Sequence, residues 1–535
     1  MSNDDRHVLP TTESPAEDLG APSPATVEAE GGAHGLADVP QLGLFAALAS
    51  LSYVFWICGG MEMVERLAFY GVKAVATLYA KDPVSKGGLG ISMTSFGIIL
   101  AAWAWTQTLV PVFTGGLSDR YGYKETIFVS TIVKILGYLT MAFFPSFGGF
   151  FAGAILLATG TAIFKPGIQG TLVKATSREN SSMAWGVFYQ TVNIGGFLGP
   201  LVAGFMRKME WRYVFLACAA IICLNFLFLL TYKEPGKAER LERNARIKAG
   251  HERRESLFRE SLHELKKKHV WVYLAIFSGF WFMFNALFDV LPAHIDDWVD
   301  SSDVVRTLFG HHGTTNPVVK FFVVMNEEGT HIQPEGMLNL DAGMIMVTCF
   351  LFAWLSGRMR ATTSMVVGTL LATLALFMIG LSVAGWTMVF AIIIFAIGEM
   401  LSSPKFSEFI GNFAPADKKA MYLGFSQIPL AVGWGIEGFL GPALYDRWAS
   451  KDRFARELLL ERGMPADAVS AIHQGEAFDK LVEFTKETPQ HLTQVLHDSH
   501  HVGLLWVVLG VIGIVSAIGI YIYGRWILTL TKKPG

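Results

Sequence analysis

A long apolar run over residues 44–80 carries charged side chains that could bind a charged solute or a proton. On a helix, Glu62, Glu65 and Arg66 stand at i, i+3 and i+4 and share one face, which Tyr70 extends by a turn. A charge at bilayer depth costs about 2.5–3.5 kcal/mol and is tolerated where it faces a bundle interior or a wet cavity. A Glu62–Arg66 pair that only holds two helices together is one interpretation. It leaves Glu65 without a partner, so we favour a cavity-facing site.

The composition predicts a membrane protein. Of the 535 residues, 52% are hydrophobic and 16% are charged, whereas soluble domains carry about 25% charged residues. The net charge of -2 indicates no nucleic acid as a partner, and we expect a monomer in a lipid bilayer. The four cysteines lie in apolar runs without a CxxC pair, which is typical of core thiols rather than disulfides or metal ligands. They are Cys58, Cys218, Cys223 and Cys349.

Twelve apolar stretches are each long enough to cross a membrane, since a span needs about 20 mostly apolar residues. We therefore expect an all-α membrane protein with twelve transmembrane helices, six in a bundle over 41–233 and six in a bundle over 270–535. The acidic residues 1–40 predict a disordered tail without the features of a signal peptide. The spans are expected near 44–80, 92–115, 125–145, 147–173, 183–206, 211–233, 270–292, 338–358, 362–383, 385–411, 420–445 and 502–527.

A basic linker over 234–269 separates the halves and sets the expected orientation. Positive charge stays inside, so the linker and both termini are expected in the cytoplasm of a cell with this protein in its plasma or inner membrane. An amphipathic surface helix and a solvated charged tether fit the linker equally well. Long outer connections are expected at 293–337 and 446–500, with a helical pattern at 453–460. The histidines of these connections form no compact ligand set, so we expect no metal site.

A charged turn with flanking glycines is expected after the second span, over 115–124. Glycines would tighten the turn, and a carboxylate there could accept from a helix N-terminus or an arginine and hold one side shut. This segment resembles the signature loop of the major facilitator superfamily, in which it would act as a gating loop. Its residues of interest are Gly115, Asp119, Arg120, Gly122 and Lys124.

Further stretches resemble one family of that superfamily, the proton-dependent oligopeptide transporters. The matching segments are Glu62–Gly71 for the ExxER motif of the first helix, Gly160–Pro166 for the lysine segment of the fourth, Phe188–Gly196 for the fifth, and Gly398–Pro404 for the tenth. The chain departs from the family pattern at Leu67, Phe69, Gly167 and Asp289.

The resemblance implies a proton-coupled symporter that imports di- and tripeptides by alternating access, with protons as the coupling ion and no other cofactor. A zwitterionic peptide separates its amine and carboxylate by about 7 Å or more, so its pocket needs a cation and an anion on opposite sides. The family roles carried over are carboxylate binding by Arg66 and Lys165, amine binding by Glu399, pocket lining by Tyr70 and Asn193, proton coupling by Glu62 or Glu65, and proton-linked gating by Asp289.

Several alternatives remain open at this point. Glu399 lies about 14 residues into its span, or roughly 21 Å, which is near mid-depth. Glu437 inside the eleventh span is the rival for the second-half substrate contact. The departures also allow another cargo, such as an amino-acid derivative, nitrate or an organic anion. A membrane enzyme or scaffold is the remaining class. We expect no enzyme, because the predicted spans contain no histidine and no nucleophile–base pair.

Overall fold

The computed structural model describes the chain except residues 1–43, 178–179, 249–264, 414–424, 426 and 532–535. The acidic tail predicted for residues 1–40 therefore lies outside the described residues. Helices make up most of the described chain, and its β-structure is limited to two isolated bridges. Eight described helices are long and apolar enough to cross a membrane, judged by length and composition.

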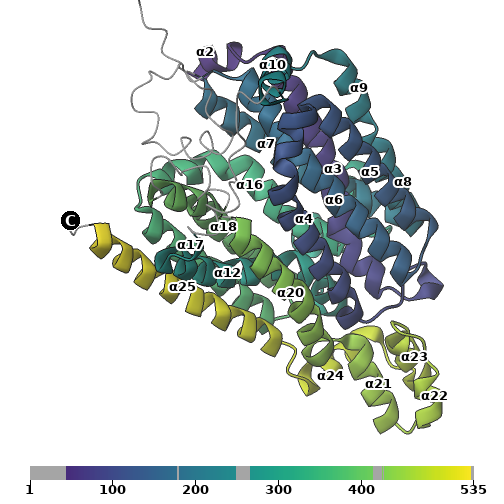
Figure 1. The fold of residues 1–535 in the computed structure, drawn as a ribbon. Coiled ribbons are helices and arrows are strands. Elements are labelled where there is room, and N and C mark those ends of the chain that lie inside the picture. Colours follow the sequence, from purple (N-terminus) through teal and green to yellow (C-terminus); the bar gives the residue numbers. More distant parts are fainter. Residues whose placement is uncertain (1–43, 178–179, 249–264, 414–424, 426, 532–535) are drawn as a thin grey trace, which may run out of the picture.

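The expected fold class, twelve long helices in two six-helix halves, is confirmed (Figure 1). Four of these helices, α3, α7, α16 and α20, are not among the eight. The first half contains α3 (Tyr53–Lys81), α4 (Met93–Tyr121), α5 (Tyr123–Phe143), α6 (Phe147–Ala175), α7 (Ser181–Arg207) and the successive α8 (Trp211–Ile222) and α9 (Leu224–Thr231). The second half contains α12 (Lys268–Asp289), α16 (Pro334–Gly357), α17 (Ala361–Leu381), α18 (Gly385–Phe413), α20 (Gln427–Trp448) and α25 (Leu504–Thr531).

Two predicted boundaries are wrong for local reasons. The apolar run 44–80 is not one helix, because a short α2 (Leu44–Ala49) ends before Ser52, whose Oγ caps α3 by accepting from the N–H of Phe55 at 3.3 Å. The expected loop at 115–124 is mostly helix, since α4 continues to Tyr121 and α5 begins at Tyr123. The turn is reduced to Gly122, whose φ of 122° favours glycine.

Contacts between the halves involve a few helix pairs. The helix α4 packs on α20, α7 packs on α16, and α3 packs on α12 and on α13 (Leu291–Trp298), which directly follows α12. Inside each half, the closest neighbours include α5 with α6, α3 with α7, and α17 with both α18 and α25. The helices α3, α16, α18 and α20 therefore lie at or next to the junction between the halves.

The two ends of the bundle differ. One end, called here the linker end, carries α10 (Lys237–Lys248), which is joined to α6 by the 3.0 Å pair between Lys174 and Glu239. The first part of the basic linker is thus a helix. The opposite end, called the loop end, carries the connecting helices, and Figure 1 shows the two halves converging toward it. These helices are α13, α14 (Ser302–Phe309), α15 (Pro317–Phe322), α21 (Lys451–Glu461), α22 (Ala466–Ser470), α23 (Ala477–Thr485) and α24 (Pro489–Ser499).

The segment α21–α24, inserted between α20 and α25, forms a small helical cap at the loop end. The helical pattern predicted at 453–460 lies in α21. Leu459, Leu481 and Leu496 are fully buried and give the cap its own apolar core. The cap also reaches the first half, where Glu476 accepts from Ser85 at 2.5 Å. Residues of the second half therefore cover part of the first half at this end.

Candidate functional site

The charged face of α3 is buried, as its spacing predicted. Glu62 and Arg66 are each 4% exposed, and Glu65 is fully buried. Arg66 contacts both carboxylates of its own helix: its Nε lies 3.2 Å from Glu62 Oε1 and donates to Glu65 Oε2 at 2.5 Å. The guanidinium also lies 5.1 Å from the centroid of the Phe69 ring. One arginine therefore serves two buried carboxylates.

Glu65 has a second cation as a partner, so the expectation that it lacks one is wrong. Lys134 of α5 is fully buried and its Nζ lies 3.3 Å from Glu65 Oε1, which also accepts from Thr161 of α6 at 3.2 Å. The same ammonium lies 3.8 Å from the centroid of the Phe164 ring. A single lysine inside the apolar stretch 125–145 was the available signal. Its partner could not be assigned, because α5 and α3 are far apart in sequence.

Glu62 is less completely bonded than Glu65. Its Oε2 is buried and has no hydrogen-bond partner among the described residues. Lys165 of α6 is solvent-exposed, and its positive charge acts on Glu62. Of the two carboxylates that sequence could not separate, Glu62 is thus the one with an oxygen available to take up a proton.

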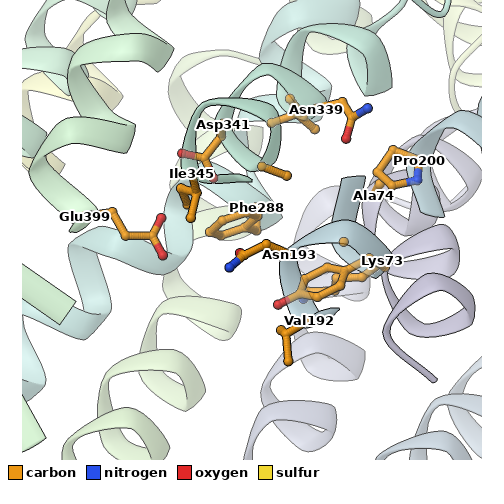
Figure 2. A pocket seen from close by; sticks show the side chains of 14 residues that line it. Lys73, Ala74, Val192, Asn193, Pro200, Phe288, Asn339, Asp341, Ile345 and Glu399 are labelled. Carbon is orange, nitrogen blue, oxygen red and sulfur yellow. The ribbon is translucent and has the colours of Figure 1, made fainter. Parts of the chain in front are cut away.

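A cavity lies between the two halves and brings together three of the predicted substrate residues. Tyr70 of α3, Asn193 of α7 and Glu399 of α18 all line it. Figure 2 shows Asn193 and Glu399 at this cavity. About 90 Å³ is available there to the centres of water molecules, which is room for roughly six to nine waters and hence for a small solute. Arg66 and Lys165 lie outside this lining, Arg66 one turn along α3 from Tyr70.

Asp341 of α16 is a cavity residue that the sequence analysis missed. It is 4% exposed, and its Oδ1 has no hydrogen-bond partner among the described residues. The same holds for Oε2 of Glu399. Figure 2 shows both carboxylates on the same side of the cavity, contributed by neighbouring helices of the second half. Asp341 could have been found in the sequence in the same way as Glu399, because it is an acidic residue inside a predicted span, 338–358.

Asp289 belongs to a polar network that joins α3 to α12 and α20. It is 2% exposed and forms an ion pair with Lys73 of α3. Asn285 donates to Asp289 Oδ2 at 2.6 Å and to Glu437 Oε2 at 2.8 Å. Glu437 is fully buried and does not line the described cavity. Of the two rival carboxylates, Glu399 lines the cavity between the halves and Glu437 does not.

Further ion pairs join the halves at the loop end. Lys81 of α3 lies 2.5 Å from Asp296 and 2.6 Å from Asp297 of α13. Arg207 of α7 lies 2.5 Å from Glu335 of α16, which is fully buried. Lys73–Asp289 is a further ion pair between the two halves.

A second cavity of about 230 Å³ at the loop end is lined by charged residues of both halves. Asp82, which follows α3, lines it together with Asp296 and Lys451. Burial, and the negative charge of Asp296, raise the pKa of Asp82 to about 6. Burial lowers the pKa of Lys451 to about 8. The loop end therefore contains groups whose charge changes near neutral pH.

The segment predicted as a gating loop is only partly described. The side chains of Asp119 and Arg120 and the surroundings of Gly115 lie outside what the structure describes. Lys124 donates to the backbone oxygen of Tyr232 at 2.7 Å. Lys124 thus ties the start of α5 to the end of α9, inside the first half.

Histidine and metal chemistry have little support in the described chain. Among the described residues, no group of three or more His, Cys, Asp or Glu side chains is arranged to hold a metal ion. His294 in α13 is buried just beyond the span predicted at 270–292, and its Nδ1 accepts from Trp506 Nε1 at 3.1 Å. This histidine joins α13 to α25 and has a structural partner.

Comparison with known proteins finds membrane transporters among the relatives of this chain. The chain is 27% identical over 201 residues to an uncharacterized transporter, YclF, of Bacillus subtilis (strain 168), covering 37% of this chain and 40% of that protein. It is 30% identical over 161 residues to the peptide transporter YePEPT of Yersinia enterocolitica subsp. palearctica serotype O:3 (strain YE-P4), covering 29% and 31%. These matches span less than half of either relative.

The similarity in fold extends much further than the similarity in sequence. A crystal structure of the peptide transporter POT in complex with sulfate matches 92% of this chain and 98% of that chain, with a TM-score of 0.61 and 18% identity. The family model of the Major Facilitator Superfamily matches residues 63–436, which is most of the sequence. The chain therefore belongs to the major facilitator superfamily.

Proposed function

We propose that the protein is a proton-coupled symporter of short peptides in the proton-dependent oligopeptide transporter family. The observation that carries this proposal is the cavity between the halves, lined by Tyr70 and Asn193 of the first half and by Glu399 of the second. A ligand that contacts both halves binds the closed state more tightly than the open one, and so favours closure. The motif resemblance and the peptide transporter among the relatives supply the substrate class.

The charges of the cavity support a substrate with an amine. Glu399 lines the cavity and has a carboxylate oxygen without a hydrogen-bond partner among the described residues. A carboxylate in that state gains most from a cationic ligand, because a buried unpaired charge is costly. We assign the peptide amino terminus to Glu399. Its carboxylate is assigned, on the family resemblance alone, to Arg66 and Lys165, which lie outside the described lining of the cavity. Nitrate or an organic anion fits less well beside carboxylates.

We assign the coupled proton to Glu62. Glu65 is held by Arg66, Lys134 and Thr161, so its negative charge is compensated. Glu62 shares Arg66 with Glu65 and keeps one oxygen without a partner. When Glu62 is protonated, Arg66 would pair with Glu65 alone. When Glu62 releases that proton, Arg66 would be attracted to Glu62 again. Proton binding and the position of Arg66, one turn from Tyr70, are in this way linked.

The loop end acts as a gate in this proposal. A proton on Asp289 would neutralise the partner of Lys73 and weaken the pair between α3 and α12. The positive-inside rule supports a cytoplasmic position for the basic linker end, so in this proposal the loop end faces outward. The structure then corresponds to the state closed to the outside. We further propose that the protein works as a monomer in the plasma or inner membrane, with both termini cytoplasmic and no cofactor besides protons.

Uptake by proteoliposomes tests the proposal. Purified protein is reconstituted, and labelled Ala-Ala is offered with an imposed proton gradient, inside alkaline. We expect accumulation above the external concentration, and equilibration alone when the gradient is collapsed with a protonophore. Accumulation of nitrate but not of peptide would overturn the substrate class. Accumulation that persists after collapse of the gradient would overturn the coupling.

A further inference from the structure

The cavity contains more negative charge than one peptide amine requires. Asp341 and Glu399 both line it, and each has a carboxylate oxygen without a partner in the described chain. Asp341 is 4% exposed, so water cannot fully solvate it. Figure 2 shows the two carboxylates on the same side of the cavity.

The cations near the cavity are already engaged by other acids. Lys73, which lines it, forms an ion pair with Asp289. Arg66 is shared by Glu62 and Glu65. Glu62, Glu65 and Asp289 are thus matched by cations of the first half, whereas the described lining of the cavity offers no further cation for Asp341 and Glu399. A ligand is the natural source of that charge.

Two carboxylates in one enclosed site cannot both ionise cheaply, since their repulsion adds to the cost of burial. In the empty cavity, protons reduce this cost. A ligand with one ammonium compensates one carboxylate and leaves the other with its proton. A ligand with two ammonium groups compensates both, and its second group gains a charged hydrogen bond at little extra entropy cost.

We propose that the cavity selects short peptides that carry a second cation, with the amino terminus on Glu399 and the basic side chain on Asp341. This inference rests on the proposed function and deepens it by naming the substrate class. Asp341 then determines the specificity for a basic side chain, while Glu399 binds the amino terminus that all these peptides have.

Competition experiments on the reconstituted protein test the proposal. Uptake of labelled Ala-Ala is inhibited with Lys-Ala, unlabelled Ala-Ala or Glu-Ala. We expect Lys-Ala to inhibit at least tenfold more strongly than Ala-Ala in the native protein. In Asp341→Asn, that preference should fall to about one while Ala-Ala uptake continues. Asn339→Ala removes an uncharged side chain from the same cavity and is the matched control, in which the preference should remain.

A binding readout covers variants that do not transport. Lys-Ala should raise the melting temperature of the purified native protein more than Ala-Ala does, and Asp341→Asn should lose that difference. Asp341→Glu keeps the negative charge, so the difference in melting temperature between Lys-Ala and Ala-Ala should remain in this variant.

Three outcomes would overturn the inference. Equal inhibition by Lys-Ala and Ala-Ala in the native protein removes the preference while leaving peptide transport intact. If the preference for Lys-Ala survives in Asp341→Asn, another residue is responsible for that preference. If Asp341→Asn changes the number of protons carried per peptide but leaves the preference for Lys-Ala unchanged, the pair of Asp341 and Glu399 is a proton site instead. Failure of every peptide, by contrast, would overturn the proposed function itself.

Discussion

Replacement of Lys134 by methionine is the perturbation whose effect the structure defines best. Lys134→Met keeps an unbranched chain of similar length but removes the ammonium that lies 3.3 Å from Glu65 and 3.8 Å from the Phe164 ring centroid. Removing one partner of a buried ion pair costs about 3–5 kcal/mol. Because Glu65 retains Arg66 and Thr161, we expect the lower end of that range, about 3 kcal/mol in the free energy of unfolding.

The predicted loss can be expressed as a melting temperature. At about 2–4 °C per kcal/mol for a unit of 150–250 residues, the first half should melt about 6–12 °C lower in Lys134→Met. The double variant Lys134→Met/Glu65→Gln removes both charges. It should lose less than the sum of the single variants, by about 2 kcal/mol, because the two sites are in direct contact.

Thiol labelling during heating measures these changes. Cys58 and Cys218 are buried, so a thiol-reactive dye reaches them when the first half unfolds. Cys223 is exposed and should be replaced by serine in every variant to remove the background. A Lys134→Met variant that melts like the native protein would refute the assigned pair. Strict additivity in the double variant would show that Lys134 and Glu65 do not interact.

Three further predictions concern the gate and the cavity. Lys73→Ala leaves Asp289 without its cation and should open the loop end, seen as a longer distance between spin labels at the exposed positions Val84 and Ala468; an unchanged distance would contradict the gate. The pKa of Asp82 is raised to about 6 in the closed state, so the closed loop end binds more protons than an open, hydrated one. A rise in pH through 6 should therefore favour opening. Asp82→Asn should flatten this pH dependence of the distance between the same two spin labels. Glu399→Gln should impair uptake of free-amine dipeptides and largely spare N-acetylated ones, whereas that selectivity in Glu437→Gln alone would make Glu437 the substrate contact.

The spans and the charged face of α3 could be predicted because each depends on one helix. Apolar length marks a span, and the i, i+3, i+4 spacing places Glu62, Glu65 and Arg66 on one face. The boundaries failed where capping by Ser52 and the turn at Gly122 overrode the apolar pattern. Helix α4 also continues past the apolar stretch, because nothing in residues 115–121 forces the backbone out of a helix.

What the sequence did not reveal is the partner that each buried charge meets. Lys134 and Glu65 are brought together because α6 packs on both α5 and α3, and Asp341 lines the same cavity as Glu399 because α16 lies beside α18. A pattern within one helix gives the face on which a side chain stands. It does not give the helix that this face meets, so Glu65 was predicted to lack a partner and Asp341 was overlooked.

Accumulation compared with exchange in Glu62→Gln tests the central claim most directly, with Glu65→Gln as the matched variant one turn along α3. Proteoliposomes are assayed for uphill uptake of labelled Ala-Ala under a proton gradient, and for exchange of labelled against unlabelled Ala-Ala without one. Exchange returns the carrier loaded and needs no proton release. The account predicts that Glu62→Gln loses accumulation and keeps exchange. Normal accumulation in Glu62→Gln would contradict the account.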